Sequence, residues 1–164
     1  MNMDVVLPTS GLPIMADTVA AEIDQLGARL QIIDRIEKGF GVVPVLEDGA
    51  VLLRKGEVAV YREEPPFEMK PGLYCLEHQR LRLSGSVNPE GWREVEREVV
   101  YARPWSRGGT SQECWEYIPL RSKIIRGVRR YARPEGPISY VWFGRLLLGP
   151  IVGVYAPTTF AGEC

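Results

Sequence analysis

Six basic side chains and no acidic one fall within residues 121–133, and this is the most unusual charge feature of the sequence. Arginine predominates, and its guanidinium group forms paired hydrogen bonds with carboxylate or phosphate oxygens. The segment could follow a phosphate backbone, with Tyr131 and Trp142 nearby for stacking, or pair with acidic groups of this chain or of a protein partner. We favour pairing with protein, because a net charge of −1 gives little long-range attraction to a polyanion. The candidate binding residues are Arg121, Lys123, Arg126, Arg129, Arg130 and Arg133.

His78 is the only histidine, and it follows Cys75 by three positions. Side chains three positions apart on a strand point to opposite faces, so these two would not chelate one metal ion. A zinc site normally needs four ligands, and Cys114 is the only other internal thiol. The glycines at 108–109 also lack the lysine and the helix of a phosphate-binding loop. We therefore expect no metal and no cofactor.

A serine can be activated as a nucleophile only where a base touches it in space. The serines and lysines that could form such a pair are Ser10, Ser84, Ser86, Lys55 and Lys70. Nothing in their spacing predicts contact. Glu63 and Glu64 precede two prolines in an expected turn, where solvated carboxylates are ordinary. The sequence therefore indicates no catalytic residue.

The fold is most legible in residues 49–83, where apolar side chains alternate with polar or small ones as they do along a half-buried strand. Proline breaks the alternation at 65–66 and at 71, because it lacks the N–H that a central strand donates. Strands are expected at 51–53, 58–60 and 73–76, with a hairpin beginning at 81–83, and elsewhere at 41–46, 95–101, 114–120, 140–143 and 146–155. Loops are expected at 84–93 and 103–113.

One long helix is expected over residues 16–38, after an irregular arm at 1–14. Asp17 or Thr18 can cap its start. Its apolar side chains recur at steps of three and four and so form one stripe for the core. The stripe consists of Val19, Ile23, Leu26, Leu30, Ile33 and Ile36. Gly27 lies within the helix and weakens its propensity.

Four runs of the sequence resemble the C-terminal domain of LexA-like repressors, the S24 serine/lysine peptidase family. The runs are Gly49-Ala50-Val51, GEVAVY at 56–61, PGLYCLEHQRLRL at 71–83 and GPIVGVYAP at 149–157. The resemblance spans residues 41–157. It implies a compact, mostly β domain with twisted, partly coiled sheets, in a family whose members typically dimerise and often carry an N-terminal helix-turn-helix.

The sequence departs from this family at the catalytic positions. The family's serine precedes a proline and a Gly-Asp turn, but here residues 41–44 read Gly-Val-Val-Pro and the turn reads Gly49-Ala50. Where the family has its lysine, this chain offers Arg80 and Arg82, and a guanidinium does not lose its proton to act as a base. The resemblance therefore implies a domain without the catalytic dyad. With one clear helix in the first 40 residues, no helix-turn-helix is expected.

The composition, 45% apolar and 25% charged residues, is that of an ordinary globular protein. Three cysteines without framework spacing predict reduced thiols in a cytosolic protein. Residues 138–157 are strongly apolar, but Arg145 near their middle would cost about 2.5–3.5 kcal/mol in a membrane. We therefore expect a soluble, cytoplasmic protein that does not enter the membrane.

The fold expected for residues 1–164 is one α+β domain, a mostly β, twisted and partly coiled sheet over 41–157 with one long N-terminal helix. Residues 121–133 are expected to add a short basic helix, although Gly127 and the β-branched side chains leave a strand open. The expected function is a non-catalytic regulatory or protein-binding module that acts with a protein partner or as a homodimer. A nucleic-acid-associated regulator that uses residues 121–133 is the second hypothesis, and a Ser/Lys hydrolase is the third.

Overall fold

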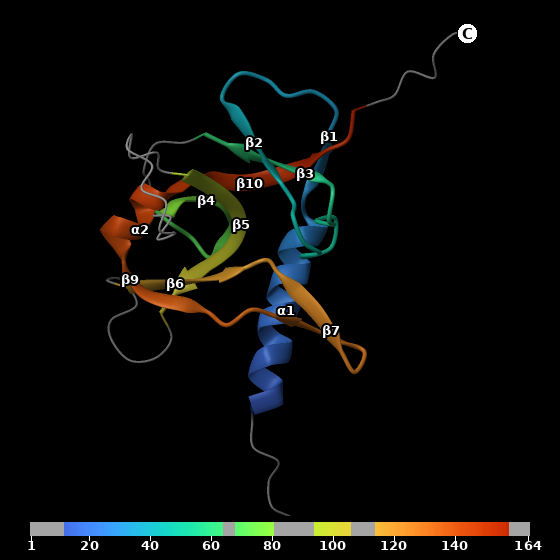
Figure 1. Cartoon of the computed structure of the whole chain (residues 1–164), viewed down its shortest axis with the longest axis vertical. Coiled ribbons are helices and arrows are strands. Elements are labelled where there is room, and N and C mark those ends of the chain that lie inside the picture. Colours follow the sequence, from blue (N-terminus) through green and yellow to red (C-terminus); the bar gives the residue numbers. More distant parts are fainter. Residues whose placement is uncertain (1–11, 64–67, 81–93, 106–113, 158–164) are drawn as a thin grey trace, which may run out of the picture.

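The computed structural model describes residues 12–63, 68–80, 94–105 and 114–157 (Figure 1). The fold is mixed and mostly β, as the sequence predicts. The helices are α1 (Leu12–Ala28) and α2 (Tyr140–Leu146). The strands are β1 (Gln31–Ile33), β2 (Phe40–Pro44), β3 (Val58–Arg62), β4 (Gly72–Arg80), β5 (Glu94–Pro104), β6 (Cys114–Pro119), β7 (Ser122–Ile125), β8 (Val128–Tyr131), β9 (Glu135–Ser139) and β10 (Leu147–Tyr155).

Eight of the strands form one curved sheet in the order β2-β3-β10-β4-β5-β6-β9, and β1 joins it beside β10 (Figure 1). The first half of β10 is antiparallel to β4, with Pro150 opposite Tyr74. Its second half lies between antiparallel β3 and parallel β1. Gly153 permits this arrangement, because a Cβ there would lie 2.4 Å from the backbone oxygen of Gln31. Strand β10 therefore ties the two halves of the sheet together.

Alternate residues of the central strands pack into two different cores. On β4, Leu73 and Cys75 enter the core that α1 covers through Ile23, whereas Tyr74 and Leu76 enter the core that contains Phe143 of α2. Side chains alternate between the two faces of a sheet, so both faces are covered here. Helix α1 contributes to the core on one face of these strands, and α2 contributes to the core on the other.

The long N-terminal helix expected over 16–38 is not confirmed. Helix α1 ends at Ala28, and residues 31–33 form β1 beside β10. Ile33 continues the apolar spacing of the helix, but pairing with β10 gives this segment the hydrogen bonds of a parallel ladder. Ile36 is 36% exposed and lies outside the core. The helical spacing of the last two isoleucines is therefore a coincidence of sequence.

Two expected strands are also wrong. Residues 140–143 begin α2, because the Ser139 side chain accepts a hydrogen bond from the backbone N–H of Trp142 at 3.2 Å and caps the helix. Residues 51–53 form a turn, with Leu52 at a φ of 69°. The other expected strands are confirmed as β2, β3, β4, β5, β6 and β10. The hairpin start at 81–83, the loop at 84–93 and nearly all of the arm at 1–14 lie outside the described residues.

Neither helix of the described part combines the length and the apolar composition needed to cross a bilayer. The apolar stretch 138–157 instead supplies α2 and the central strand β10. The guanidinium of Arg145 lies in the last turn of α2 and is exposed.

Gly27 lies where α1 passes over the turn at 50–51. A Cβ at this position would lie 2.6 Å from the carbonyl oxygen of Val51 and 2.8 Å from the Ala50 Cβ. In an open helix, a Gly-to-Ala change stabilises by up to about 1 kcal/mol. We expect Gly27→Ala to do the opposite and lower the free energy of unfolding by roughly 1–3 kcal/mol, because the added methyl group overpacks the contact.

Chemical denaturation measures this change. Gln25→Ala, at an exposed position of the same helix, is the matched control and should stay within about 0.5 kcal/mol of wild type. A Gly27→Ala variant more stable than wild type would show that α1 does not press on the turn.

Candidate functional site

The basic segment forms a β-hairpin, so the short helix expected there is wrong and the strand alternative is right. Strands β7 and β8 pair with Lys123 opposite Arg130 and Ile125 opposite Val128. The turn between them consists of Arg126 and Gly127, with φ angles of 53° and 77°. Positive φ at both central residues is the two-residue turn that matches the twist of paired strands.

The inner face and the base of the hairpin are fixed to the rest of the fold. The Ser122 hydroxyl donates to the backbone oxygen of Asp48 at 2.8 Å, and the Arg129 guanidinium donates to the backbone oxygen of Gly49. The Tyr131 hydroxyl donates to an Asp24 carboxylate oxygen at 3.4 Å. Burial, and then the Asp24 charge, raises the pKa of Tyr131 to about 12, so the phenol remains a donor at neutral pH. These contacts hold the hairpin against α1 and the turn at 48–49.

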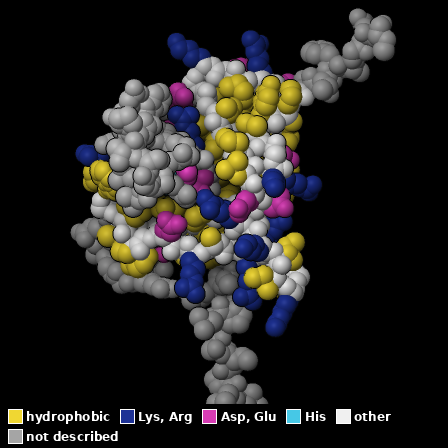
Figure 2. Space-filling view, in the orientation of Figure 1, with side chains coloured by type: hydrophobic (Ala, Val, Ile, Leu, Met, Phe, Trp, Pro, Cys, Tyr) yellow, Lys and Arg dark blue, Asp and Glu magenta, His cyan; other side chains and the backbone are white. Residues whose placement is uncertain are grey.

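The outer face and the tip of the hairpin carry exposed cations beside exposed apolar side chains. On the outer face, the side chains of Ile125 and Val128 are 48% and 46% exposed. Ile124, opposite Arg129 on the inner face near the tip, is 72% exposed. Figure 2 shows basic side chains flanking hydrophobic ones where Figure 1 places this hairpin. Exposed β-branched residues next to cations are the composition of a contact surface rather than of a solvated strand.

The six candidate residues thus fall into two groups. Arg121 pairs with Glu98 at 3.2 Å, and Arg129 binds a backbone oxygen, so these two stabilise the fold. The other four are exposed, and no ion pair or hydrogen bond of their side chains is found within the described residues. We call these four the hairpin cations: Lys123, Arg126, Arg130 and Arg133.

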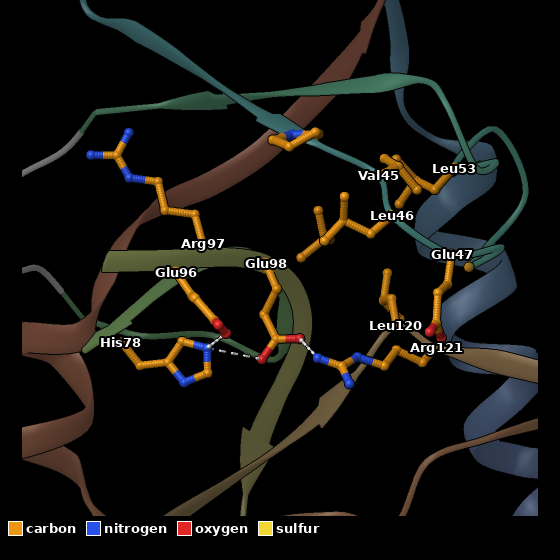
Figure 3. Close-up of a pocket in the computed structure, with 13 residues that line it drawn as sticks. Val45, Leu46, Glu47, Leu53, His78, Glu96, Arg97, Glu98, Leu120 and Arg121 are labelled. Carbon is orange, nitrogen blue, oxygen red and sulfur yellow. Dashed lines mark hydrogen bonds and ion pairs between the residues drawn. The ribbon is translucent and has the colours of Figure 1, made fainter. Parts of the chain in front are cut away.

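A cavity of about 460 Å³ lies beside the base of the hairpin and includes Arg121 in its wall (Figure 3). The Nε2 atom of His78 lies 3.7 Å from a Glu96 oxygen and 3.5 Å from a Glu98 oxygen. Glu98 also accepts the hydrogen bond of Arg121, so a row of polar side chains runs along one side of the cavity. Apolar side chains also line the cavity: Val45, Leu46, Leu53 and Leu120.

The polar row was missed in the sequence because it depends on register. His78 lies opposite Glu96 on the neighbouring strands β4 and β5, eighteen positions apart in the chain. Cys75 is buried in the core that α1 covers (the α1-side core), whereas His78 lines the cavity, so the two side chains point to opposite faces of β4, as expected from their spacing. Within the described residues, no group of three or more potential ligands is placed to hold a metal ion.

The cavity wall contains no hydroxyl, thiol or amine among the described residues. The groups beside His78 are the carboxylates of Glu96 and Glu98. Cys75 is buried elsewhere, and burial raises the pKa of its thiol to about 12, which keeps it protonated and unreactive. The wall offers an imidazole, carboxylates and guanidinium groups, which can bind polar groups of a ligand.

The resemblance to LexA-like peptidases would place their serine at Gly41, where any side chain would require Tyr61 to move. Gly41 lies in β2 opposite Tyr61 of β3, and a Cβ there would lie 2.2 Å from the ring carbon that bears the hydroxyl. Arg80 ends β4, and Arg82 lies outside the described residues, as do Ser10, Ser84 and Ser86. A serine at position 41 would therefore displace the ring that fills this part of the core.

No protein-family model matches the chain, and comparison with the curated proteins and with the solved structures gives no match either.

Proposed function

We propose that this protein is a non-catalytic binding module that holds an anionic macromolecule through the hairpin of β7 and β8. The observation that carries the proposal is the exposure of the four hairpin cations, for which the described residues provide no partner. Fold stability explains Arg121 and Arg129, which are already bonded, but it does not explain these four. A regulatory role would agree with the resemblance to LexA-like domains that lack the dyad.

The net charge of −1 does not oppose this proposal once the cations are placed in space. Screening limits the reach of a charge to about 8 Å at physiological ionic strength. An approaching anion therefore responds mainly to the charges near the hairpin. There Lys123 and Arg130 stand opposite each other on neighbouring strands, and like charges in this position weaken strand pairing. A bound anion between them would remove this repulsion.

Heparin tests the proposal, because it is a polyanion without bases. We expect Lys123→Gln/Arg130→Gln to elute from immobilised heparin at clearly lower salt than wild type, since two cations leave the binding surface. Arg54→Gln/Lys55→Gln is the control with the same change of net charge, and these two residues are exposed in the loop before β3.

The control should elute close to wild type, and circular dichroism should show both variants folded. Equal loss of retention in the two variants would mean that heparin senses net charge only. Retention of the hairpin variant at the wild-type salt concentration would also contradict the proposal.

A further inference from the structure

The shape of the hairpin defines the kind of anion that it fits. We propose that its partner is duplex DNA and that β7 and β8 enter the major groove; this inference rests on the proposed function. Two paired strands are about 5 Å apart, and the major groove, about 12 Å wide, admits a two-stranded ribbon of this kind. The minor groove, at about 6 Å, is too narrow for such a ribbon. The major groove of duplex RNA is also too narrow for side chains to read.

The cations are distributed as two groove walls require. Lys123 lies on β7, Arg130 lies opposite it on β8, and Arg126 lies at the turn. A groove has phosphates on both walls, so cations on both strands can bind at once. A flat acidic surface would engage one face of the ribbon and leave the turn free.

The apolar pair gives the hairpin a contact that phosphates cannot supply. Ile125 and Val128 are cross-strand partners next to the turn, and about half of each side chain is exposed. They share a face of the ribbon with Lys123 and Arg130. Directly paired residues point to the same face, and residues two positions apart on one strand do so as well. In the major groove, the methyl group of thymine is the apolar feature that such side chains contact.

The turn argues against insertion into a membrane. Arg126 is exposed at the tip, where an inserting hairpin would be desolvated first. A guanidinium in the hydrocarbon region costs about 2.5–3.5 kcal/mol on insertion scales. In a DNA groove the same side chain meets phosphate or a guanine edge, both of which accept its hydrogen bonds.

Fluorescence anisotropy with a duplex of mixed sequence, two helical turns long, and with one of its strands tests the inference. We expect wild type to bind the duplex more tightly than the single strand. Lys123→Gln/Arg130→Gln should flatten the slope of log affinity against log salt by about two, one for each lost phosphate contact. Arg54→Gln/Lys55→Gln should leave that slope unchanged.

Ile125→Ala/Val128→Ala separates groove binding from simple attraction to a polyanion. It should weaken duplex binding by about tenfold, through loss of apolar contact, and leave elution from heparin unchanged. Bound protein should also protect guanine N7, an atom of the major groove, from methylation by dimethyl sulfate.

The outcomes distinguish this inference from the proposed function. Hairpin-dependent heparin retention without preference for the duplex, or without N7 protection, would overturn the groove inference alone. Tighter binding to vesicles of anionic lipid than to the duplex would overturn it in favour of a membrane partner. Heparin retention that does not depend on the hairpin cations would overturn both.

Discussion

Val154→Asp should lower the free energy of unfolding by roughly 3–5 kcal/mol, because it leaves an unpaired charge inside the sheet. Val154 is 4% exposed and lies in β10, with Ile32 of β1 on one side and Ala59 of β3 on the other. No described cation faces it within the α1-side core. For a chain of this size the change corresponds to a drop in Tm of about 10 °C.

A thermal melt measures this effect, and Val42→Asp provides the control. Val42 lies in β2 of the same sheet, but 43% of it is exposed, so the new carboxylate can reach water. We expect the control to lose no more than about 1 kcal/mol. If Val154→Asp melts within a few degrees of wild type, β10 is not the central strand of the folded protein.

Arg103→Met is the second change for which we expect a large effect. The carboxylate of Glu116 is almost completely buried, at 2% exposure, and accepts a hydrogen bond from Arg103 Nε at 2.6 Å across strands β5 and β6. Without the guanidinium, a buried charge would lack its partner. We expect a loss of roughly 3–5 kcal/mol, measured by urea unfolding.

A second variant and a matched pair make this prediction specific. Adding Glu116→Gln to Arg103→Met removes the buried charge that has lost its partner, so the double variant should recover part of the lost stability. Arg97 and Glu77 form a similar cross-strand pair, at 2.8 Å, but Arg97 is 47% exposed. Arg97→Met should therefore cost less than about 1 kcal/mol. Equal losses for Arg97→Met and Arg103→Met would contradict the role of burial.

Alternation in the sequence located most of the strands of the sheet, because their buried side chains enter the cores at alternate positions. It failed where tertiary contacts outweigh local spacing. Residues 31–33 continue a helical stripe, yet β10 holds them as a strand. Residues 140–143 are aromatic and β-branched, yet the Ser139 cap and the burial of Phe143 make them a helix. Neither a distant strand nor a cap in use can be recognised from residue spacing.

The candidate site was predictable in composition but not in arrangement. The six basic residues are visible in the sequence, and Gly127 already kept a strand as an alternative to the short helix. Their division into bonded and exposed groups depends on Gly49 and Glu98, which are far from them in the chain. The polar row of the cavity depends on the register between β4 and β5. Such contacts follow from sheet pairing, which spacing along one strand does not specify.

The place of β10 in the sheet also determines when this protein can fold. Its partners β1, β3 and β4 are complete by residue 80, but they meet only through residues 147–155. A chain emerging from the ribosome therefore exposes the open edges of β3 and β4 until nearly the whole sheet has been made. Pairings so distant in sequence fold slowly, and open edges in that interval favour aggregation. Expression at a lower rate or in the presence of chaperones should therefore protect the nascent chain during the interval before β10 arrives.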